Sequence, residues 1–335
     1  MVAVTIKDVA REAGVSITTV SMVLNESDYP ISEKTKQKVF ETAKKLNYVP
    51  NRIARNLVTR KSNSIALIVP DITNPFYPEI AKAVSEVAEK RGYNLILINT
   101  NNQTTKKSAW LEVLENGLIE GALVISREPT ITDAYKRAKD IKIVHLDEPG
   151  FLSDKDAYIV TGDSEEGGYL AGKHLISLGH KKLACIAGPE ETPNSSRRLS
   201  GFLKVCMEND IYLDSRHILF GNYSFDGGYE CGEILAKEDI TAIFAFNDLS
   251  AFGAIKALKE SGKEVVRDYS IIGYDNLLMT AYTDPSLTTI DQFSKQIGIS
   301  ATNILLDLIS GREVKERKVL IKPKLLIRET TSKID

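Results

Sequence analysis

The sequence predicts an α/β protein in which a small helical domain precedes two doubly wound parallel-sheet domains. Short amphipathic helical patterns fill the residues up to Leu46, and from Ile65 onward short apolar runs alternate with helical stretches. At 335 residues the chain fits two or three domains. With 43% hydrophobic and 26% charged residues, its composition is that of a globular protein.

The opening residues predict three helices joined by a glycine turn and a loop. Thr5 caps the first helix, Gly14 ends it, Ser16 caps the second, and Ser32 precedes the third. A helix, a glycine-containing turn and a second helix form the arrangement of a DNA-binding helix-turn-helix. The predicted inner faces are Ile6, Val9, Ala10 and Ala13, then Val20, Val23 and Leu24, then Val39, Phe40, Ala43 and Leu46.

A short segment with helical periodicity follows the third helix. Pro50 stops that helix, and Asn51 to Val58 is too short to be a stable helix alone in water. Residues 59–64 are polar and typical of a linker. A segment that is marginal by itself is a candidate for folding on contact with a partner.

Continuous apolar runs between helical stretches such as Pro78–Arg91 and Leu249–Ser261 indicate parallel sheets covered on both faces. The runs are too many for one compact unit, so we predict two doubly wound domains. Ligands of such folds bind beyond the carboxyl ends of strands. The runs are IALIV, NLILIN, GALVI, IKIVHL, YIVTG, KLACIA, HILFG, AIFAF and SIIGY, and polar residues follow several of them at Asp71, Asp147, Asp163, Asn247 and Asp275.

The charge is divided unevenly along the chain. Through Lys61 there are 11 Lys and Arg against 6 Asp and Glu, and the remainder holds 32 against 39. A basic N-terminal segment joined to an acidic remainder suggests a nucleic-acid-binding module attached to a domain with a different function.

Several classes of protein are excluded. The residues before Arg11 lack the apolar run of a signal peptide, and no run approaches the roughly 18 residues needed to span a bilayer. Cys185, Cys206 and Cys231 are widely spaced and indicate buried thiols in a reducing compartment. The four histidines form no ligand cluster, and no catalytic motif is present. We expect a cytoplasmic protein without a membrane partner, a metal, a cofactor or enzymatic activity.

The motifs VTIKDVAREAGVSITTVSMVLN, KLNYVPNRIARNLVTRKSNSIALIVPDITNPFY, GHKKLACIAGP, FNDLSAFGAIKAL, IIGYDN and PSLTTIDQ resemble the lactose/galactose repressor (LacI/GalR) family of bacterial transcription regulators. The resemblance covers nearly the whole chain. It implies a DNA-binding domain at 1–50, a hinge helix and linker at 51–61, and a dimerising core like the periplasmic sugar-binding proteins. The implied core subdomains are 62–161 with 291–322, and 162–290 with 323–335.

The resemblance also implies which residues contact DNA. The second helix would lie in the major groove, with Ile17, Thr18 and Met22 toward the bases. Many family members have Arg or His where this chain has Met22, so the base at that position stays open. Leu57 matches the leucine that the family wedges into the minor groove, although packing against the partner's hinge helix is an alternative. The remaining implied contacts are Thr5, Ser16, Thr19, Ser21, Asn25, Asn51, Ala54 and Arg55.

An effector site between the core subdomains is implied in the same way. Aromatic rings, carboxylates, amides and a guanidinium suit a small polyhydroxylated ring. The motifs TNPFY and TPNSSRRLSGF look most like ribose-type members, so a pentose is the first expectation. The implied residues are Asp71, Phe76, Tyr77, Asp147, Arg198, Tyr223, Asn247, Asp275 and Gln292, and strand-end carboxylates such as Asp71 and Asp163 have helix capping as their alternative role.

We therefore expect a homodimer that reads a pseudo-palindromic operator, represses a sugar-utilisation operon and responds to an effector. Whether the effector releases or strengthens DNA binding stays open. The alternatives are a purine-type ligand or a protein corepressor within the family. Outside it, the alternatives are a solute-binding protein, which the segment from Thr5 to Val58 opposes, and a sugar enzyme.

Overall fold

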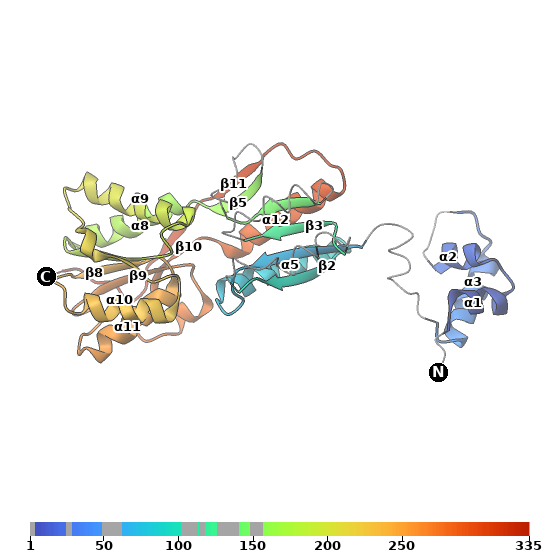
Figure 1. The fold of residues 1–335 in the computed structure, drawn as a ribbon, viewed down its shortest axis with the longest axis horizontal. Helices are drawn as coiled ribbons and strands as arrows, with labels where there is room; N and C mark the ends of the chain where they lie inside the picture. Colours follow the sequence, from blue (N-terminus) through green and yellow to red (C-terminus); the bar gives the residue numbers. More distant parts are fainter. Residues whose placement is uncertain are drawn as a thin grey trace. The chain divides into compact units, whose positions relative to one another are not determined.

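The computed structural model describes residues 4–24, 29–48, 62–101, 113, 118–125, 141–147 and 157–334. The chain divides into two compact units, Met1–Ser62 and Asn63–Asp335, which we call the head and the core (Figure 1). Within the described ranges, no helix has the length and apolar character needed to cross a membrane.

The head contains the three predicted helices, α1 (Ile6–Ala13), α2 (Ile17–Leu24) and α3 (Glu33–Lys45). Gly14 follows α1 with φ of 64°, the left-handed conformation that glycine adopts without strain. Ser32 caps α3 by accepting the backbone N–H of Thr35. The three helices enclose a small core of Val9, Ala10, Ala13, Val20, Val23, Val39 and Ala43.

The prediction that Phe40 lies on the inner face of α3 is wrong, because its side chain is 46% exposed. Val39 and Ala43 are four residues apart and lie on one face of the helix. Phe40 is one position further along, about 100° round the helix, and therefore points away from that face.

The first sheet of the core, sheet A, has the strand order β11-β5-β4-β3-β1-β2. All its pairings are parallel. Side chains of β1 alternate between two clusters, one shared with helices α5 and α12 and one on the opposite face. The elements are β1 (Ser64–Val69), α5 (Phe76–Lys90), β2 (Asn94–Asn99), β3 (Gly121–Val124), β4 (Lys142–His145), β5 (Tyr158–Gly162), α12 (Ser294–Ile309) and β11 (Lys318–Ile321).

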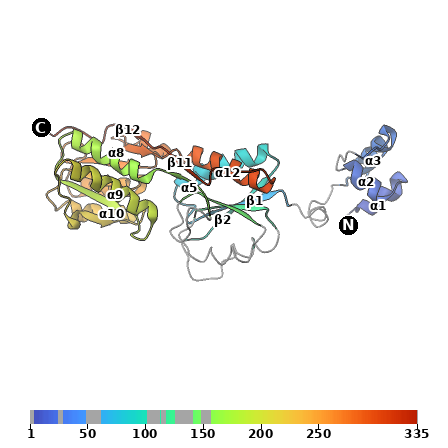
Figure 2. The same cartoon turned by 90° about the horizontal axis from the view of Figure 1, so that it is seen from above.

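The second sheet, sheet B, has the order β12-β10-β9-β8-β6-β7 and is parallel except for the β10–β12 pair. Helices α8 and α9 cover one face and α10 and α11 the other (Figures 1 and 2). Its elements are α8 (Ser164–Ser177), β6 (Leu183–Ala187), α9 (Pro193–Glu208), η1 (Ser215–His217), β7 (Ile218–Phe220), α10 (Phe225–Leu235), β8 (Ala242–Ala245), α11 (Asp248–Glu260), β9 (Ser270–Tyr274), η2 (Leu278–Ala281), β10 (Thr288–Asp291) and β12 (Lys324–Leu326).

Both sheets reverse their strand order at one place, between β1 and β3 in sheet A and between β6 and β8 in sheet B. In doubly wound folds the ligand crevice lies outside the carboxyl ends of the strands at such a switch point. The chain passes from sheet A to sheet B after β5, returns after β10, and passes again between β11 and β12. The fold therefore places the residues after β1, β6 and β8 where a ligand is expected.

Candidate functional site: a polar cluster in the core and an exposed helix in the head

The N-terminal end of α2 presents side chains to solvent. Ile17 is 45% exposed although it is apolar, and Thr18 beside it is exposed too. Ser16 accepts the backbone N–H of Thr19 at 3.0 Å and shares a hydrogen bond with the Thr19 hydroxyl at 2.8 Å. The capping role predicted for Ser16 is therefore present, and it leaves the next two side chains directed outward.

The other predicted DNA contacts fall into two groups. Thr5 is exposed, and its N–H and hydroxyl both donate to Asp8 Oδ2, at 3.0 and 2.7 Å. Ser21 and Met22 are half-buried. Asn25, Asn51, Ala54, Arg55 and Leu57 lie outside the described residues.

Arg198 is the centre of the polar cluster in the core. It lies on α9 and is 4% exposed, whereas the adjacent Arg197 is exposed. Its guanidinium lies 3.6 Å from the centre of the Tyr274 ring and 5.5 Å from that of Tyr223. Nη1 donates to the carbonyl oxygen of Phe246, while Nε is buried without a hydrogen-bond partner among the described residues.

The charge of Arg198 is maintained by its surroundings. Burial by itself would lower the pKa of this guanidinium, but the phenols of Tyr223 and Tyr274 and the carboxylates of Asp275 and Asp147 raise it above its ordinary value. A buried cation with an unused donor favours a ligand that can accept a hydrogen bond.

Asn194 belongs to the same cluster and connects the two sheets of the core through its side-chain hydrogen bonds. Its Nδ2 donates to Asp147 Oδ2, after β4 of sheet A, at 2.7 Å. Its Oδ1 accepts from the Tyr223 hydroxyl, beside sheet B, at 3.1 Å. A cavity of about 40 Å³ touches Asp147 and Asn194, which is space for roughly one water molecule.

Asp275 and Gln292 form a second buried pair. Gln292 Nε2 donates to Asp275 Oδ1 at 2.5 Å, and each residue is 5% exposed. Burial raises the pKa of Asp275 to about 7, against the opposing effect of Arg198. Burial also raises the pKa of Asp248, which accepts from the backbone of Leu277 and from the Thr289 hydroxyl.

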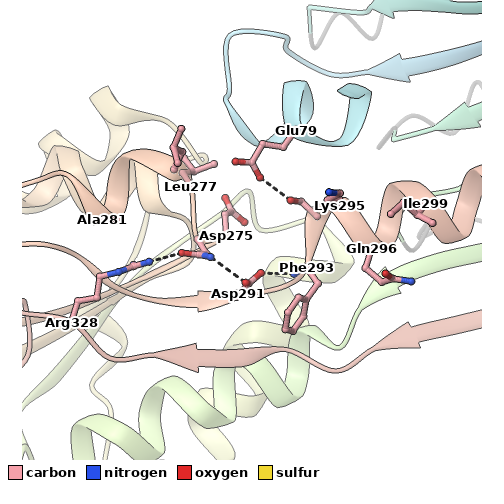
Figure 3. Close-up of a pocket in the computed structure, with 13 residues that line it drawn as sticks. Glu79, Asp275, Leu277, Ala281, Asp291, Phe293, Lys295, Gln296, Ile299 and Arg328 are labelled. Atoms are coloured by element: carbon pink, nitrogen blue, oxygen red, sulfur yellow. Dashed lines mark hydrogen bonds between the residues drawn. The ribbon is translucent and has the colours of Figure 1, made fainter. Parts of the chain in front are cut away.

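Asp275 also lines a groove of about 490 Å³ at the joint between the two sheets. Figure 3 shows Glu79 of α5 facing Asp275 across this groove, with Asp291 and Phe293 on the connection to α12. Ser294 donates to Glu79 Oε2 at 2.8 Å. The carboxylate of Glu79 contributes to the raised pKa of Asp275, so the two groups interact electrostatically.

Of the remaining predicted residues, Asn247 contacts the cluster, because its Nδ2 donates to the carbonyl oxygen of Tyr223 at 2.9 Å, and the others have local partners. Asp71 Oδ1 accepts from the N–H and hydroxyl of Thr73, and Asn247 Oδ1 accepts from Ser250 N at the start of α11. Tyr77 is buried in the core of sheet A, and Phe76 packs against it edge to face at 5.4 Å. Asp163 caps α8 by accepting the backbone N–H of Glu166 at 3.1 Å.

The structure brings Asp147, Arg198 and Tyr223 together, and Asp275 with Gln292. It adds three residues that the sequence analysis did not name as site residues. Asn194 lies one helical turn before Arg198, so a spacing of four on a predicted helix was a signal for it. Tyr274 lies in the motif IIGYDN, but its approach to Arg198 depends on how α9 packs on sheet B. Glu79 had no signal, because its approach to Asp275 depends on how the two sheets join.

The part of the chain that the structure describes holds no group of three His, Cys, Asp or Glu residues able to bind a metal ion.

A helical head followed by a two-sheet core with a polar cluster at its strand ends defines a DNA-binding protein with a ligand-binding core. The family of bacterial regulatory proteins called the lacI family matches residues 5–51, and the family of periplasmic binding proteins and the sugar binding domain of the LacI family matches residues 62–329. The chain belongs to the LacI family, and it is a DNA-binding transcription regulator and not an enzyme.

The HTH-type transcriptional repressor PurR of Mannheimia succiniciproducens is 38% identical, covering 98% of this chain and 99% of that protein. A lac repressor dimer bound to operator and the anti-inducer ONPF is 29% identical with a TM-score of 0.86, covering 99% of this chain and 100% of that one. A LacI-family regulator from Enterococcus faecium with bound ribose is 31% identical with a TM-score of 0.72, covering 81% of this chain and 100% of that one.

Proposed function

We propose that the core binds a pentose, ribose or a closely related sugar, and that this ligand controls operator binding. The observation that carries the proposal is the cluster of Asp147, Asn194 and Arg198 beside the rings of Tyr223 and Tyr274. Sugar hydroxyls both donate and accept hydrogen bonds, while the apolar C–H face of the ring packs on an aromatic face. The ribose-bound regulator from Enterococcus faecium supports this choice.

The ligand acts by replacing the contact between Asn194 and Asp147. The cavity beside that contact, about 40 Å³, is too small for a sugar, so a bound sugar has to separate the two side chains. Because Asn194 belongs to α9 and Asp147 follows β4, their separation changes how the two sheets approach each other. The ligand therefore makes different contacts in two states of the core. Coupling between the effector site and the DNA-binding site requires such a difference.

The DNA target is a pseudo-palindromic operator read by the two heads of a homodimer in the cytoplasm. The exposed Ile17 and Thr18 support placing the start of α2 against base edges. The hinge residues Ala54, Arg55 and Leu57 then occupy the minor groove between the heads.

The two subdomains of the core are proposed to be residues 62–161 with 291–322, and residues 162–290 with 323–335.

A purine base is the second candidate ligand, because the relative at 38% identity is named as the repressor PurR. A flat heterocycle would use the Tyr223 side of the cluster, because Tyr274 is fully buried beside Arg198, and it would leave fewer partners for Asp147 and Asn194. A pentose makes use of these two groups as well, and for that reason we prefer it.

Thermal unfolding of the purified protein against D-ribose, D-xylulose, hexoses, their phosphates, hypoxanthine and guanine tests the proposal. A ligand at 100 times its dissociation constant stabilises the folded state by about 2.7 kcal/mol, which raises the melting temperature by several degrees. A shift with a pentose supports the proposal. A shift with a purine alone contradicts it in favour of the second candidate, and no shift with any compound points to a protein corepressor or another metabolite.

A further inference from the structure

The beginning of the core is held by one carboxylate, that of Glu120. The backbone N–H of Asn63, the first residue of the core, donates to Glu120 Oε1 at 2.6 Å. The hydroxyl of Tyr93 donates to the other carboxylate oxygen, Oε2, at 3.3 Å. Asn63 precedes β1, Tyr93 precedes β2 and Glu120 precedes β3, so this side chain ties together the starts of three adjacent strands.

Backbone hydrogen bonds complete the anchor around Asn63. Its carbonyl oxygen accepts from the backbone N–H of Asn94 at 2.8 Å, and the N–H of Glu120 donates to the Ser64 carbonyl at 2.9 Å. Asn63 has φ of 46°, in the left-handed region, so the chain turns sharply just before β1. Such a conformation persists where the surrounding contacts fix it.

The Glu120 contact is charge-assisted, which makes it stronger than a hydrogen bond between neutral groups. Glu120 is half-buried. Burial and the Glu120 carboxylate both raise the pKa of Tyr93, so the phenol keeps its proton and continues to donate.

We propose that Glu120 is a positioning residue for operator binding, because it fixes the point and direction at which the linker to the head leaves the core. This inference rests on the operator binding by a homodimer proposed above. Two heads can occupy two half-sites only at a defined spacing. If the linker leaves each core at a fixed point, the dimer loses less conformational entropy when both heads bind.

The same anchor lies on the strand that leads to the candidate effector site. β1 runs without interruption from Ser64 to Val69, is paired on both sides, and ends two residues before Asp71. Residues 65–69 are fully buried, so the strand moves as one rigid element. A displacement at its carboxyl end is thus transmitted to the linker exit as long as Glu120 holds Asn63.

The test compares Glu120→Ala with Glu120→Gln and with the control Glu329→Ala. Glu329 also accepts a backbone N–H, that of Ser286 at 2.8 Å, but this pair lies beside β10 and β12 of sheet B, whereas Asn63 lies at sheet A. Full-length wild-type protein first selects an operator from random duplex DNA. Each variant is then titrated onto this operator and onto a copy with one base pair inserted at its centre, and its thermal unfolding is recorded.

We expect Glu120→Ala to lose about tenfold in affinity for the selected operator, which corresponds to about 1.4 kcal/mol. It should also discriminate less between the two spacings, with an unfolding temperature close to that of Glu329→Ala. Glu120→Gln should bind like the wild type, since its amide oxygen still accepts the Asn63 N–H. Glu120→Asp, whose side chain is one methylene shorter, should lose affinity as well and serves if the alanine variant does not fold.

Wild-type affinity and spacing preference in both Glu120→Ala and Glu120→Asp would overturn the inference. Equal losses in Glu120→Ala and Glu329→Ala would overturn it too, because the effect would then be general destabilisation. If the wild type selects no operator at all, the proposed function fails together with this inference, and that result is distinct from the other two.

Discussion

Arg198 is the residue on which the candidate effector site depends. Replacing it by alanine removes the buried guanidinium whose Nε has no partner among the described residues, and with it the ligand's charged anchor. We expect Arg198→Ala to abolish the change in operator affinity caused by D-ribose while operator affinity without ligand stays nearly intact. Fluorescence anisotropy of labelled operator, with and without D-ribose, measures both quantities.

Arg197→Ala is the comparison variant, because Arg197 is the adjacent residue on α9 and is exposed, and it lines the small cavity with Asp147 and Asn194. It should keep most of the ligand response. A normally folded Arg198→Ala protein that no longer binds DNA would count against the assignment, and loss of the response only in Arg197→Ala would transfer the role to that residue.

Asp275 predicts a pH dependence of stability with an unusual sign for a carboxyl group. Its pKa is raised by burial to about 7, whereas in an unfolded chain it is about 3.9. The folded state therefore binds more protons in this interval, and stability falls as pH rises from about 4 to about 7. Asp275→Asn, which cannot titrate, should show a flatter profile of unfolding free energy in urea between pH 5 and pH 8.

The difference between the two profiles isolates this group from the histidines, since burial lowers the pKa of His145, His174 and His180 and gives them the opposite pH effect. Parallel profiles for wild type and variant would show that Asp275 is ionised in the folded state at neutral pH.

At the scale of single residues, motifs in the sequence predicted residues that the structure brings together around Arg198. Arg198 and Tyr223 could be named because they lie in the motifs TPNSSRRLSGF and GNYSFDGG. Asn194 was missed, although it precedes Arg198 by one helical turn. The neighbours Tyr274 and Glu79 depend on the approach of separate strands and helices, which no local pattern encodes.

At the scale of helices and strands, the close packing of α8 against α9 determines where Arg198 lies. A Cβ atom on Gly201 would lie 1.9 Å from the Glu165 carbonyl oxygen, so only glycine allows these helices to pack so closely. Gly201→Ala should destabilise the protein by about 1–3 kcal/mol, because the helices must move apart. Urea unfolding measures this change, and ligand affinity should fall too, because Arg198 is on α9.

Ser200→Ala on the exposed face of the same helix is the control and should unfold at nearly the wild-type urea concentration. If Gly201→Ala unfolds there as well, the two helices are free to adjust and the close crossing does not position Arg198.

Periodicity predicted the strands β1 to β9 because each is a continuous or nearly continuous apolar run. The strands β10, β11 and β12 were not among these runs. β11 and β12 are short edge strands that are largely half-buried and begin with a lysine, and their signal is correspondingly weak. Helix starts were predictable within two residues, since caps such as Thr5 and Ser32 are local features.

At the scale of the whole molecule, we expect the proposed hinge to contribute more to specific DNA binding than to non-specific DNA binding. Leu57 is proposed to wedge between central base pairs, and its contribution depends on the sequence being bent. Leu57→Ala should weaken binding to the selected operator far more than binding to random duplex DNA. Competition titrations at fixed salt measure the ratio, and equal losses on both DNAs would exclude the wedge.

The most direct single measurement is the affinity of the wild-type protein for its selected operator with and without saturating D-ribose. Because the ligand is proposed to replace the Asn194–Asp147 contact between the sheets, we expect operator affinity to change by about 5–150-fold, the usual range of such coupling. An operator affinity that no pentose changes, or that only hypoxanthine or guanine changes, would contradict control by a pentose.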